Sequence, residues 1–355
     1  MQNMRAPPDI GRLQQACHAL NRGTGSRGTS SEPGRSPGPG FLLQNGILGC
    51  CAHELTIATQ SAADQNGLST ASLPRRHPRN VCHGSLVDEP RSDNPIFIGG
   101  VPRSGTTLLR VILDTHPRIY CGTELRVVQA LTNLWWSAEQ RGRPLLEQAY
   151  SVDAEHLRRI FTDLVLSFLR PAWLASGKPR VAEKTPFNVL VFPQLGRLFP
   201  DAALVHIIRD VRDVVASRLE RARATGASSA ETVTLARERA EEWVRVMEIR
   251  SKMLADEQLS RSYFEIRYEE LVHSPHVALE ALFAFLGEHF YPDVLSFHRV
   301  ARNVDGTEEW SAAAVRRPIF ASSCGRWRQS LSIEELRAVL QVAGPTVESL
   351  GYDSH

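Results

Sequence analysis

A loop of small and hydroxyl-bearing residues with one arginine is the first stretch of the sequence that could do chemistry. It spans residues 100–107 and reads G-V-P-R-S-G-T-T. A short apolar run at residues 96–98 precedes it, and leucines and isoleucines at helical spacing follow it over residues 106–114. The first backbone N–H groups of a helix have no internal partner and lie at the positive end of the helix dipole. The strand–loop–helix pattern therefore predicts an anion site, most simply a phosphate site.

The loop departs from the nucleoside-triphosphate loop G-x-x-x-x-G-K-[ST] at its charged position. Thr106 stands where that motif has the lysine that reaches the β- and γ-phosphates, and the positive charge comes from Arg103 instead. One arginine with three hydroxyls can hold a terminal phosphate, but it is poorly equipped for a triphosphate with magnesium. The alternative is an ordinary glycine turn between a strand and a helix. The residues predicted to hold the phosphate are Arg103, Ser104, Gly105, Thr106 and Thr107.

This loop and the segments after it carry a resemblance to a known family. The sequence F-I-G-G-V-P-R-S-G-T-T-L is followed by D-T-H-P and then by C-G-T-E-L-R. In these segments the chain resembles the sulfotransferases that use 3′-phosphoadenosine 5′-phosphosulfate (PAPS), and most of all the tyrosylprotein-sulfotransferase branch and its bacterial relatives. The resemblance extends over about residues 94–353 and is strongest at residues 100–108. It implies that the loop holds the 5′-phosphate of PAPS.

The resemblance assigns catalytic roles to two residues of opposite charge. Glu124 matches the general base of the family segment C-G-E-E-T-R, although Thr123 replaces the glutamate before it. Lys184, in E-K-T-P-F, matches the lysine that stabilises the departing phosphate oxygen. Arg126 matches the arginine of the first segment, with the role of orienting Glu124 or the acceptor. On the residues alone, Glu124 is equally a carboxylate at the start of a helix, and Lys184 a surface lysine at a strand end.

A second group of residues is implied to bind the nucleotide. The sequence R-D-V-R-D-V-V-A-S fits the family pattern R-D-x-R-x-x-x-x-S, in which Arg209 and Ser217 hold the 3′-phosphate. A guanidinium offers a phosphate two parallel hydrogen bonds, which an ammonium cannot. The resemblance adds nucleotide contacts at Arg221, at Tyr268 in I-R-Y-E-E-L, and at Arg317.

Three further parts of the sequence carry predictions of other kinds. The loop at residues 303–312 is expected to fold over the nucleotide, although it lacks the serines and lysines of the family loop. Arg212 and Arg218 are predicted to lie on a solvated helix face. Trp135 and Trp136 offer an apolar wall to an acceptor, but core packing is the favoured use of at least one of them.

These residues need a scaffold that brings them to one place. Short apolar and β-branched runs predict strands at residues 96–98, 180–183, 203–208 and 263–267. Helical periodicity predicts helices at residues 106–114, 123–138, 153–169, 193–199, 211–223, 230–254, 277–286, 333–342 and 345–350. Strands separated by helices favour a mostly parallel sheet, in which ligands bind beyond the carboxyl ends of the strands. We predict one P-loop-like α/β domain over residues 93–355.

Residues 1–92 differ in composition from this domain. Residues 23–40 are rich in Gly, Ser, Pro and Arg, and such a stretch buries too little apolar surface to offset its chain entropy. We predict a mostly disordered extension of low complexity. The alternative is a second small domain, for which the segment shows little periodicity.

The net charge, the apolar runs and the cysteines limit the expected partners and the expected cellular compartment. The formal net charge of +2 gives no reason to expect a nucleic-acid or membrane partner. No apolar run approaches the roughly 20 residues of a membrane helix. The 6 cysteines form no C-x-x-C pair, so neither a metal site nor a disulfide framework is expected. Cys121 matches a family cysteine that is disulfide-bonded in secretory members, but its partner position is Ala182 here. We therefore expect a reducing, cytoplasmic setting, and a homodimer is compatible with the sequence.

Three functions remain open at this level. The first is sulfuryl transfer from PAPS, with no metal, to a hydroxyl of a protein tyrosine, a glycan or a small molecule. The second is a P-loop kinase or nucleotide hydrolase, against which Thr106 counts. The third is a non-catalytic nucleotide-binding module. A fold shared by all sulfotransferases does not choose among acceptors.

Overall fold

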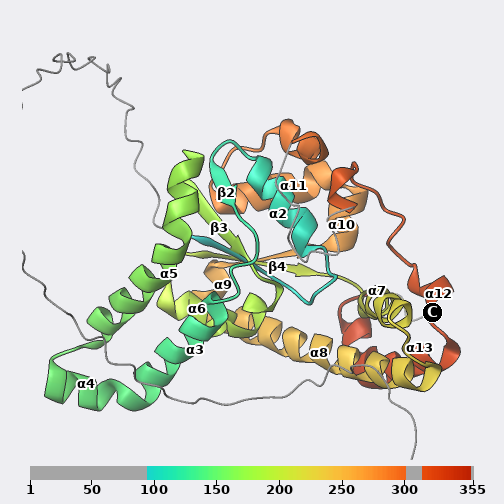
Figure 1. Cartoon of the computed structure of the whole chain (residues 1–355), viewed down its shortest axis with the longest axis horizontal. Helices are drawn as coiled ribbons and strands as arrows, with labels where there is room; N and C mark the ends of the chain where they lie inside the picture. The colour runs from blue at the N-terminus through green and yellow to red at the C-terminus, as the bar shows by residue number, and fades with distance from the viewer. Residues whose placement is uncertain (1–93, 301–313, 353–355) are drawn as a thin grey trace, which may run out of the picture. The chain divides into compact units, whose positions relative to one another are not determined.

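The computed structural model describes residues 94–300 and 314–352 of the chain. Within them, five parallel strands form one sheet in the order β2-β3-β1-β4-β5, with helices on both faces (Figure 1). The predicted α/β fold with a parallel sheet is confirmed. The predicted disordered extension over residues 1–92 and the loop at residues 303–312 lie outside the described residues.

The strands are short and mostly buried. Their bounds are β1 Ile96–Gly99, β2 Ile119–Cys121, β3 Arg180–Lys184, β4 Ala203–Ile208 and β5 Tyr263–Arg267. Every residue of the central strand β1 is buried, as expected for a strand covered on both faces. Four strands match the predicted ones to within one residue. The exception is β2, which has three residues and depends on pairing with β3 rather than on a local pattern.

The register of the sheet aligns the strand ends that matter. Ile98 lies opposite Lys184, and Gly99 lies opposite His206. Because all the strands are parallel, their carboxyl ends meet at one edge of the sheet. The loops that leave this edge carry the residues with predicted chemistry.

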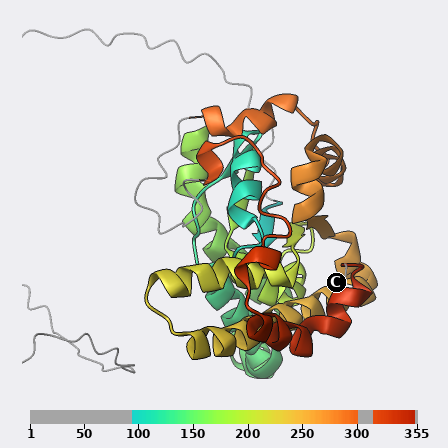
Figure 2. The ribbon, with the colours of Figure 1, turned by 90° about the vertical axis from the view of Figure 1, so that its right-hand side faces the viewer.

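Two helical layers cover the sheet. One consists of α2 (Thr106–Thr115), α10 (Tyr268–His273), α11 (Pro275–Leu286) and the turn η3 (Pro292–Arg299). The other consists of α3 (Val128–Ser137), α5 (Ala154–Ser176), α6 (Phe192–Leu198), α7 (Val211–Ala224), α8 (Ser229–Ala255) and α9 (Glu257–Arg261), with α13 (Ile333–Ser349) alongside α8 (Figures 1 and 2). Phe97 of β1 points into the second layer, and its neighbours Ile96 and Ile98 point into the first. The alternation of a strand therefore divides the core in two.

The remaining helical elements are short and lie between those already named. They are η1 (Ala138–Gly142), α4 (Arg143–Tyr150), η2 (Pro186–Val191), η4 (Ala314–Arg316) and α12 (Trp327–Ser330). No helix among the described residues is long and apolar enough to cross a bilayer.

The start of α7 is set by a residue of its own sequence. The Asp210 side chain accepts a hydrogen bond from the Arg212 amide, and the helix therefore begins directly after β4.

Four predicted helices differ from the structure. The helix expected at residues 123–138 begins only at Val128, because the amides of Leu125 and Arg126 bond to side chains at the end of β3. The helix expected at residues 153–169 continues to Ser176 through an internal proline. The two helices expected near the C-terminus form the single helix α13, which also contains a proline. In both long helices tertiary packing outweighs the breaking effect of proline.

Candidate active site

A cavity of about 940 Å³ opens at the carboxyl ends of the strands. Most of the predicted site residues line it: Arg103, Gly105, Thr106, Thr107, Glu124, Arg126, Arg209, Ser217, Arg221, Tyr268 and Arg317. Two predicted residues, Ser104 and Lys184, are buried behind its wall. The fold thus gathers residues from loops after β1, β2, β4 and β5 around one space.

The loop after β1 is shaped by close packing at Gly105. This residue has φ 101°, in the left-handed region, and precedes the first turn of α2. A Cβ at this position would lie 2.5 Å from Cδ2 of Tyr268, so only glycine allows the ring to approach. Thr106 and Thr107 follow in the first helical turn. Ser104 does not face the cavity, and its amide donates to the carbonyl of Val101 at 3.0 Å.

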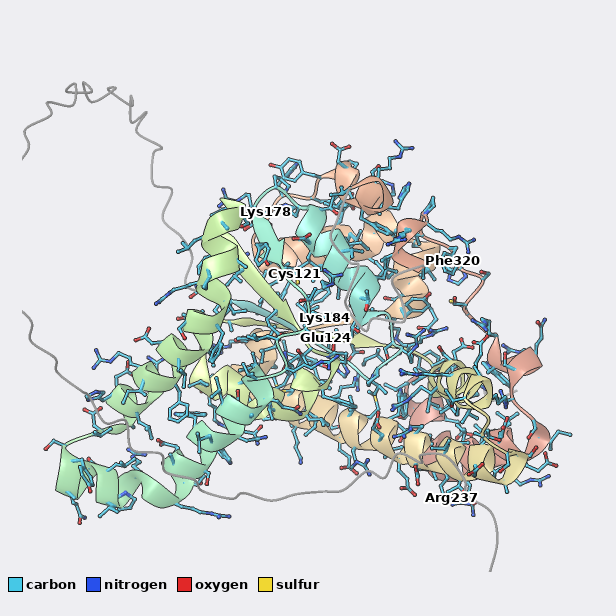
Figure 3. All side chains as sticks on the ribbon, in the orientation of Figure 1. Cys121, Glu124, Lys178, Lys184, Arg237 and Phe320 are labelled. Atoms are coloured by element: carbon cyan, nitrogen blue, oxygen red, sulfur yellow. The ribbon has the colours of Figure 1, made fainter. Side chains whose placement is uncertain are left out.

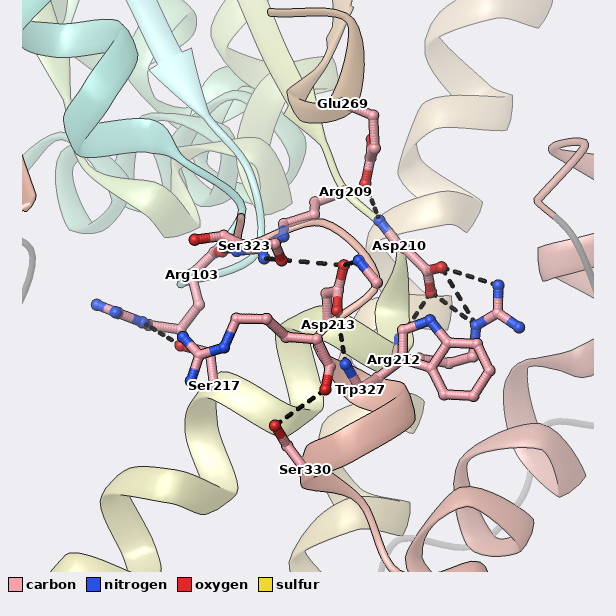
Figure 4. Close-up of polar contacts among 12 residues, drawn as sticks. Arg103, Arg209, Asp210, Arg212, Asp213, Ser217, Glu269, Ser323, Trp327 and Ser330 are labelled. Carbon is pink, nitrogen blue, oxygen red and sulfur yellow. Dashed lines mark hydrogen bonds and ion pairs between the residues drawn. The ribbon is translucent and has the colours of Figure 1, made fainter. Parts of the chain in front are cut away.

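Arginine side chains from two loops meet at one end of the cavity (Figure 4). The Nε of Arg103 donates to Oγ of Ser217 at 3.0 Å, and Nη1 of Arg209 donates to the carbonyl of Arg103 at 3.0 Å. The Arg209 guanidinium lies 4.4 Å from the ring centroid of Tyr268. Burial and the nearby charge of Arg209 lower the pKa of Arg103. Guanidinium groups gathered in this way repel each other, and a polyvalent anion between them would relieve that repulsion.

Arg209 also contains a buried nitrogen without a hydrogen-bond partner among the described residues. This nitrogen is the Nε. The other nitrogens of Arg209 donate to the carbonyls of Arg103 and Ser323. A buried donor left unpaired costs roughly 1–3 kcal/mol. Because solvent does not reach the Nε, a ligand in the cavity would contact it only after the side chain moves.

Two residues of opposite charge meet at the other end of the cavity. The Nζ of Lys184 lies 2.8 Å from Oε1 of Glu124, and the Nε of Arg126 lies 3.3 Å from Oε2 (Figure 3). The Lys184 side chain is fully buried, whereas 18% of the Glu124 side chain is exposed on the cavity wall. Both oxygens of the Glu124 carboxylate thus contact a cationic side chain, and a carboxylate at the cavity wall is a candidate proton acceptor. Glu124 lies in an irregular segment before α3, so the predicted helix start at this residue is wrong.

Comparison with known proteins identifies the family. A family model described as "Sulfotransferase family" matches residues 95–293. The chain belongs to the sulfotransferase family. The predicted resemblance is therefore confirmed. The sulfotransferase assignment favours a sulfuryl-transferring enzyme over a kinase or a nucleotide hydrolase.

Two relatives of this sulfotransferase carry the name protein-tyrosine sulfotransferase. This sulfotransferase is 30% identical over 264 residues to a putative protein-tyrosine sulfotransferase of Caenorhabditis briggsae, covering 73% of this chain and 89% of the relative. It is 28% identical over 275 residues to protein-tyrosine sulfotransferase 1 of Danio rerio, covering 73% and 72%.

Solved structures of other sulfotransferases are also similar. The sulfotransferase domain of the curacin biosynthetic pathway aligns with a TM-score of 0.49 and 20% identity, covering 74% of this chain and 99% of that one. A mouse sulfotransferase complexed with PAP aligns with a TM-score of 0.47 and 15% identity, covering 73% and 86%.

Asp213 is a site residue of the sulfotransferase that sequence reasoning missed. Its carboxylate accepts hydrogen bonds from the amides of Gly325 at 2.8 Å and Trp327 at 3.0 Å, and it lies 3.8 Å from Arg209 (Figure 4). Burial raises the pKa of this carboxyl, and Arg209 opposes the rise. Asp213 therefore joins the segment at residues 325–327 to the arginine end of the cavity. The sequence feature that could have revealed Asp213 is that it is a second aspartate, one helical turn after Arg209, in R-D-V-R-D.

The predicted solvated face of α7 is wrong at both arginines. Arg212 is 2% exposed, pairs with Asp210 at 2.8 Å and lies 4.2 Å from the Trp327 ring. Arg218 forms an ion pair with Glu242 of α8, and its side chain is 19% exposed. Glu242 and Trp327 come from α8 and from the C-terminal segment, so helical periodicity within α7 cannot reveal these contacts.

Three other residues lie where the sequence predicts. Cys121 and Ala182 are neighbours in the register of β2 and β3, and Cys121 is a free, buried thiol. Burial raises the pKa of this thiol, which keeps it protonated and unreactive. Trp135 is 4% exposed in the core, so at least one of the two tryptophans serves packing.

Proposed function

We propose that this sulfotransferase moves a sulfuryl group from PAPS to a hydroxyl acceptor. The observation that carries the proposal is the 2.8 Å contact between Lys184 and Glu124, at the wall of a cavity that Arg209 and Ser217 also line. A proton acceptor and anion-binding groups thus share one space. Proximity of this kind is what a displacement between two bound reactants requires.

The residues around the cavity suit a nucleotide with two phosphates. The loop of Arg103, Gly105, Thr106 and Thr107 would hold the 5′-phosphate at the start of α2. Arg209 and Ser217, which line the cavity, would hold the 3′-phosphate. Further contacts are proposed for Arg221, Tyr268 and Arg317, which line the same cavity, whereas the buried Ser104 would contribute through the shape of the loop.

The chemical step needs a base and a counter-charge for the leaving group. The Glu124 carboxylate would take the acceptor proton as the acceptor oxygen forms its bond to sulfur, and the bond from sulfur to the phosphate oxygen breaks. Arg126 holds Glu124 from the exposed side. Lys184 would neutralise the charge on the departing phosphate oxygen, for which its ammonium must share its contact with Glu124. PAPS supplies the activated sulfuryl group and leaves as adenosine 3′,5′-bisphosphate.

Among acceptors, we propose the phenol of a protein tyrosine as the first class to test. The relatives reported above carry the name protein-tyrosine sulfotransferase. The cavity wall also includes Leu108, Gln129 and Phe187, which offer an aromatic ring both apolar and polar contacts. Glycan and small-molecule hydroxyls are the alternatives. The cytoplasmic setting and the homodimer stay predictions.

Two measurements test the proposal. Calorimetric titration should show tight binding of adenosine 3′,5′-bisphosphate and weak binding of ATP with magnesium, and the reverse order would defeat it. Incubation with PAPS labelled in the sulfuryl group, together with tyrosine peptides, saccharides and small phenols, should label one acceptor class. Nucleotide binding without transfer to any acceptor would favour the non-catalytic module.

A further inference from the structure

A buried carboxylate lies directly beside the proposed catalytic pair. Glu183, the residue before Lys184 in β3, is 1% exposed. Its Oε1 accepts hydrogen bonds from the amide of Leu125 at 3.0 Å and from the hydroxyl of Thr185 at 2.7 Å, and its Oε2 accepts one from the side-chain amide of Asn188. All three partners donate. This arrangement suits an ionised carboxylate, which only accepts.

The hydroxyl of Thr185 extends this network by one step. Its proton goes to Glu183, so its oxygen is available to accept the amide proton of Arg126 at 3.2 Å. Two consecutive amides, those of Leu125 and Arg126, are thereby anchored to the end of β3. The anchoring is demanding, because Arg126 has φ 61°, a conformation that costs a non-glycine residue free energy.

The anchored segment carries the carboxylate of Glu124. Glu183 and Lys184 are consecutive residues of β3 and contact this segment in different ways. Glu183 binds the backbone amide of Leu125, and Lys184 binds the Glu124 side chain. Without the Glu183 contacts, the Leu125 amide would lose its partner, and the turn that holds Glu124 would be free to relax. Lys184 would then be the main contact fixing the Glu124 carboxylate from the strand.

We propose that Glu183 is a positioning residue that holds the Glu124 segment in the geometry needed for proton transfer. The inference rests on the proposed role of Glu124 as the base. Glu183 itself does not line the cavity, so it acts through the Leu125 amide and the Thr185 hydroxyl rather than on substrate. Burial raises the pKa of the Glu183 carboxyl, and its three hydrogen bonds oppose that rise.

A double-mutant cycle on the full-length protein tests this role. In Glu183→Gln, an amide NH₂ replaces one acceptor and faces donors, so we expect kcat to fall about 10- to 100-fold, the cost of a misplaced catalytic group. The dissociation constant of adenosine 3′,5′-bisphosphate should change less than about 2-fold, since the phosphate-binding residues lie on other loops. In Glu124→Gln/Glu183→Gln, kcat should equal that of Glu124→Gln alone, because a positioning residue has nothing left to position.

Further variants distinguish a positioning role of Glu183 from a general loss of folding. Thr185→Val removes the hydroxyl link and should lower kcat, whereas Thr185→Ser should restore it. Glu288→Gln is the matched control, because Glu288 is also a buried carboxylate but binds Arg180 at the opposite end of β3. We expect its kcat to stay within about 2-fold of the wild-type value.

The outcomes separate this inference from the proposed function. Additive losses in the double variant, or equal losses of kcat and bisphosphate affinity in Glu183→Gln, would overturn the positioning role. A loss in Thr185→Val that Thr185→Ser does not restore would overturn it as well. Wild-type kcat in Glu124→Gln would instead refute the proposed base.

Discussion

The Nε of Arg103 donates a hydrogen bond to Oγ of Ser217 at 3.0 Å, across 114 residues of sequence. Arg103 belongs to the loop after β1, and Ser217 lies in α7 after β4. The two proposed phosphate-binding groups are therefore in direct contact. A ligand that carries two phosphates would meet both at once, and a ligand with one would leave part of the cluster without an anion.

This contact predicts how Ser217→Ala changes ligand preference. The variant loses a hydroxyl for the 3′-phosphate and a partner for Arg103. Its affinity for adenosine 3′,5′-bisphosphate should fall about 10- to 100-fold, as expected when a hydrogen bond to a charged group is lost. Its affinity for adenosine 5′-monophosphate should change little. Calorimetric titration with both ligands checks this, and equal losses for both would contradict the assignment of the 3′-phosphate.

The contact between Lys184 and Glu124 predicts that catalysis and binding separate. Glu124→Gln keeps the shape of the side chain but cannot take a proton, and Lys184→Met keeps its length but not its charge. We expect kcat to fall about 10²- to 10⁴-fold in each. Bisphosphate affinity should remain within about 2-fold in Glu124→Gln, whereas Lys184→Met also loses the charge proposed to face the leaving phosphate and should bind the bisphosphate more weakly. Steady-state kinetics and titration measure the two quantities, and a parallel loss of both in Glu124→Gln would indicate a structural role for the pair.

The tight approach at Gly105 predicts that a single methyl group disturbs the phosphate loop. In Gly105→Ala, the new Cβ would lie 2.5 Å from the Tyr268 ring at a backbone φ of 101°. We expect bisphosphate affinity to fall at least about 10-fold, because loop and ring must move apart. Gly226→Ala is the control: Gly226 has φ 94° and nothing within 4 Å of an added Cβ. If both variants lose affinity equally, backbone strain alone explains the effect.

His206 predicts a pH dependence of stability that is independent of catalysis. This residue of β4 is fully buried next to the Tyr263 hydroxyl at 2.6 Å, and burial lowers its pKa from 6.5 to about 3, with Arg250 adding to the effect. Below pH 6.5 the unfolded chain binds a proton at this position and the folded chain does not. The stabilisation is present above pH 6.5 and is lost as the pH falls toward 3.

Between pH 7 and pH 5 this linkage should lower the free energy of unfolding by about 2 kcal/mol. Urea titrations at the two pH values measure it in the wild type and in His206→Gln, which cannot titrate at this position. The variant should be less stable at pH 7 and should lose less stability at pH 5. An identical pH dependence in both proteins would show that other groups dominate.

The sequence by itself predicted four of the five strands of this sulfotransferase and most of the residues that line its cavity. Strands β1, β3, β4 and β5 and the loop before α2 have local signatures: short apolar runs, a glycine turn and helical periodicity. The motifs around Arg103, Arg209 and Tyr268 are contiguous, so their resemblance to a family could be read directly. Because the sheet is parallel, residues at strand ends had to converge on one edge.

Only the tertiary structure decided the contacts between segments distant in sequence. It moved the start of the expected helix from residue 123 to Val128, because Glu183 and Thr185 bind the amides of Leu125 and Arg126. It buried Arg212 under Trp327 and made Asp213 the anchor of the C-terminal segment. These outcomes depend on hydrogen-bond donors and acceptors that come together only when the chain has folded. Hydrophobic periodicity predicts only which face of a single helix or strand is buried, and the partners of these residues lie on other elements.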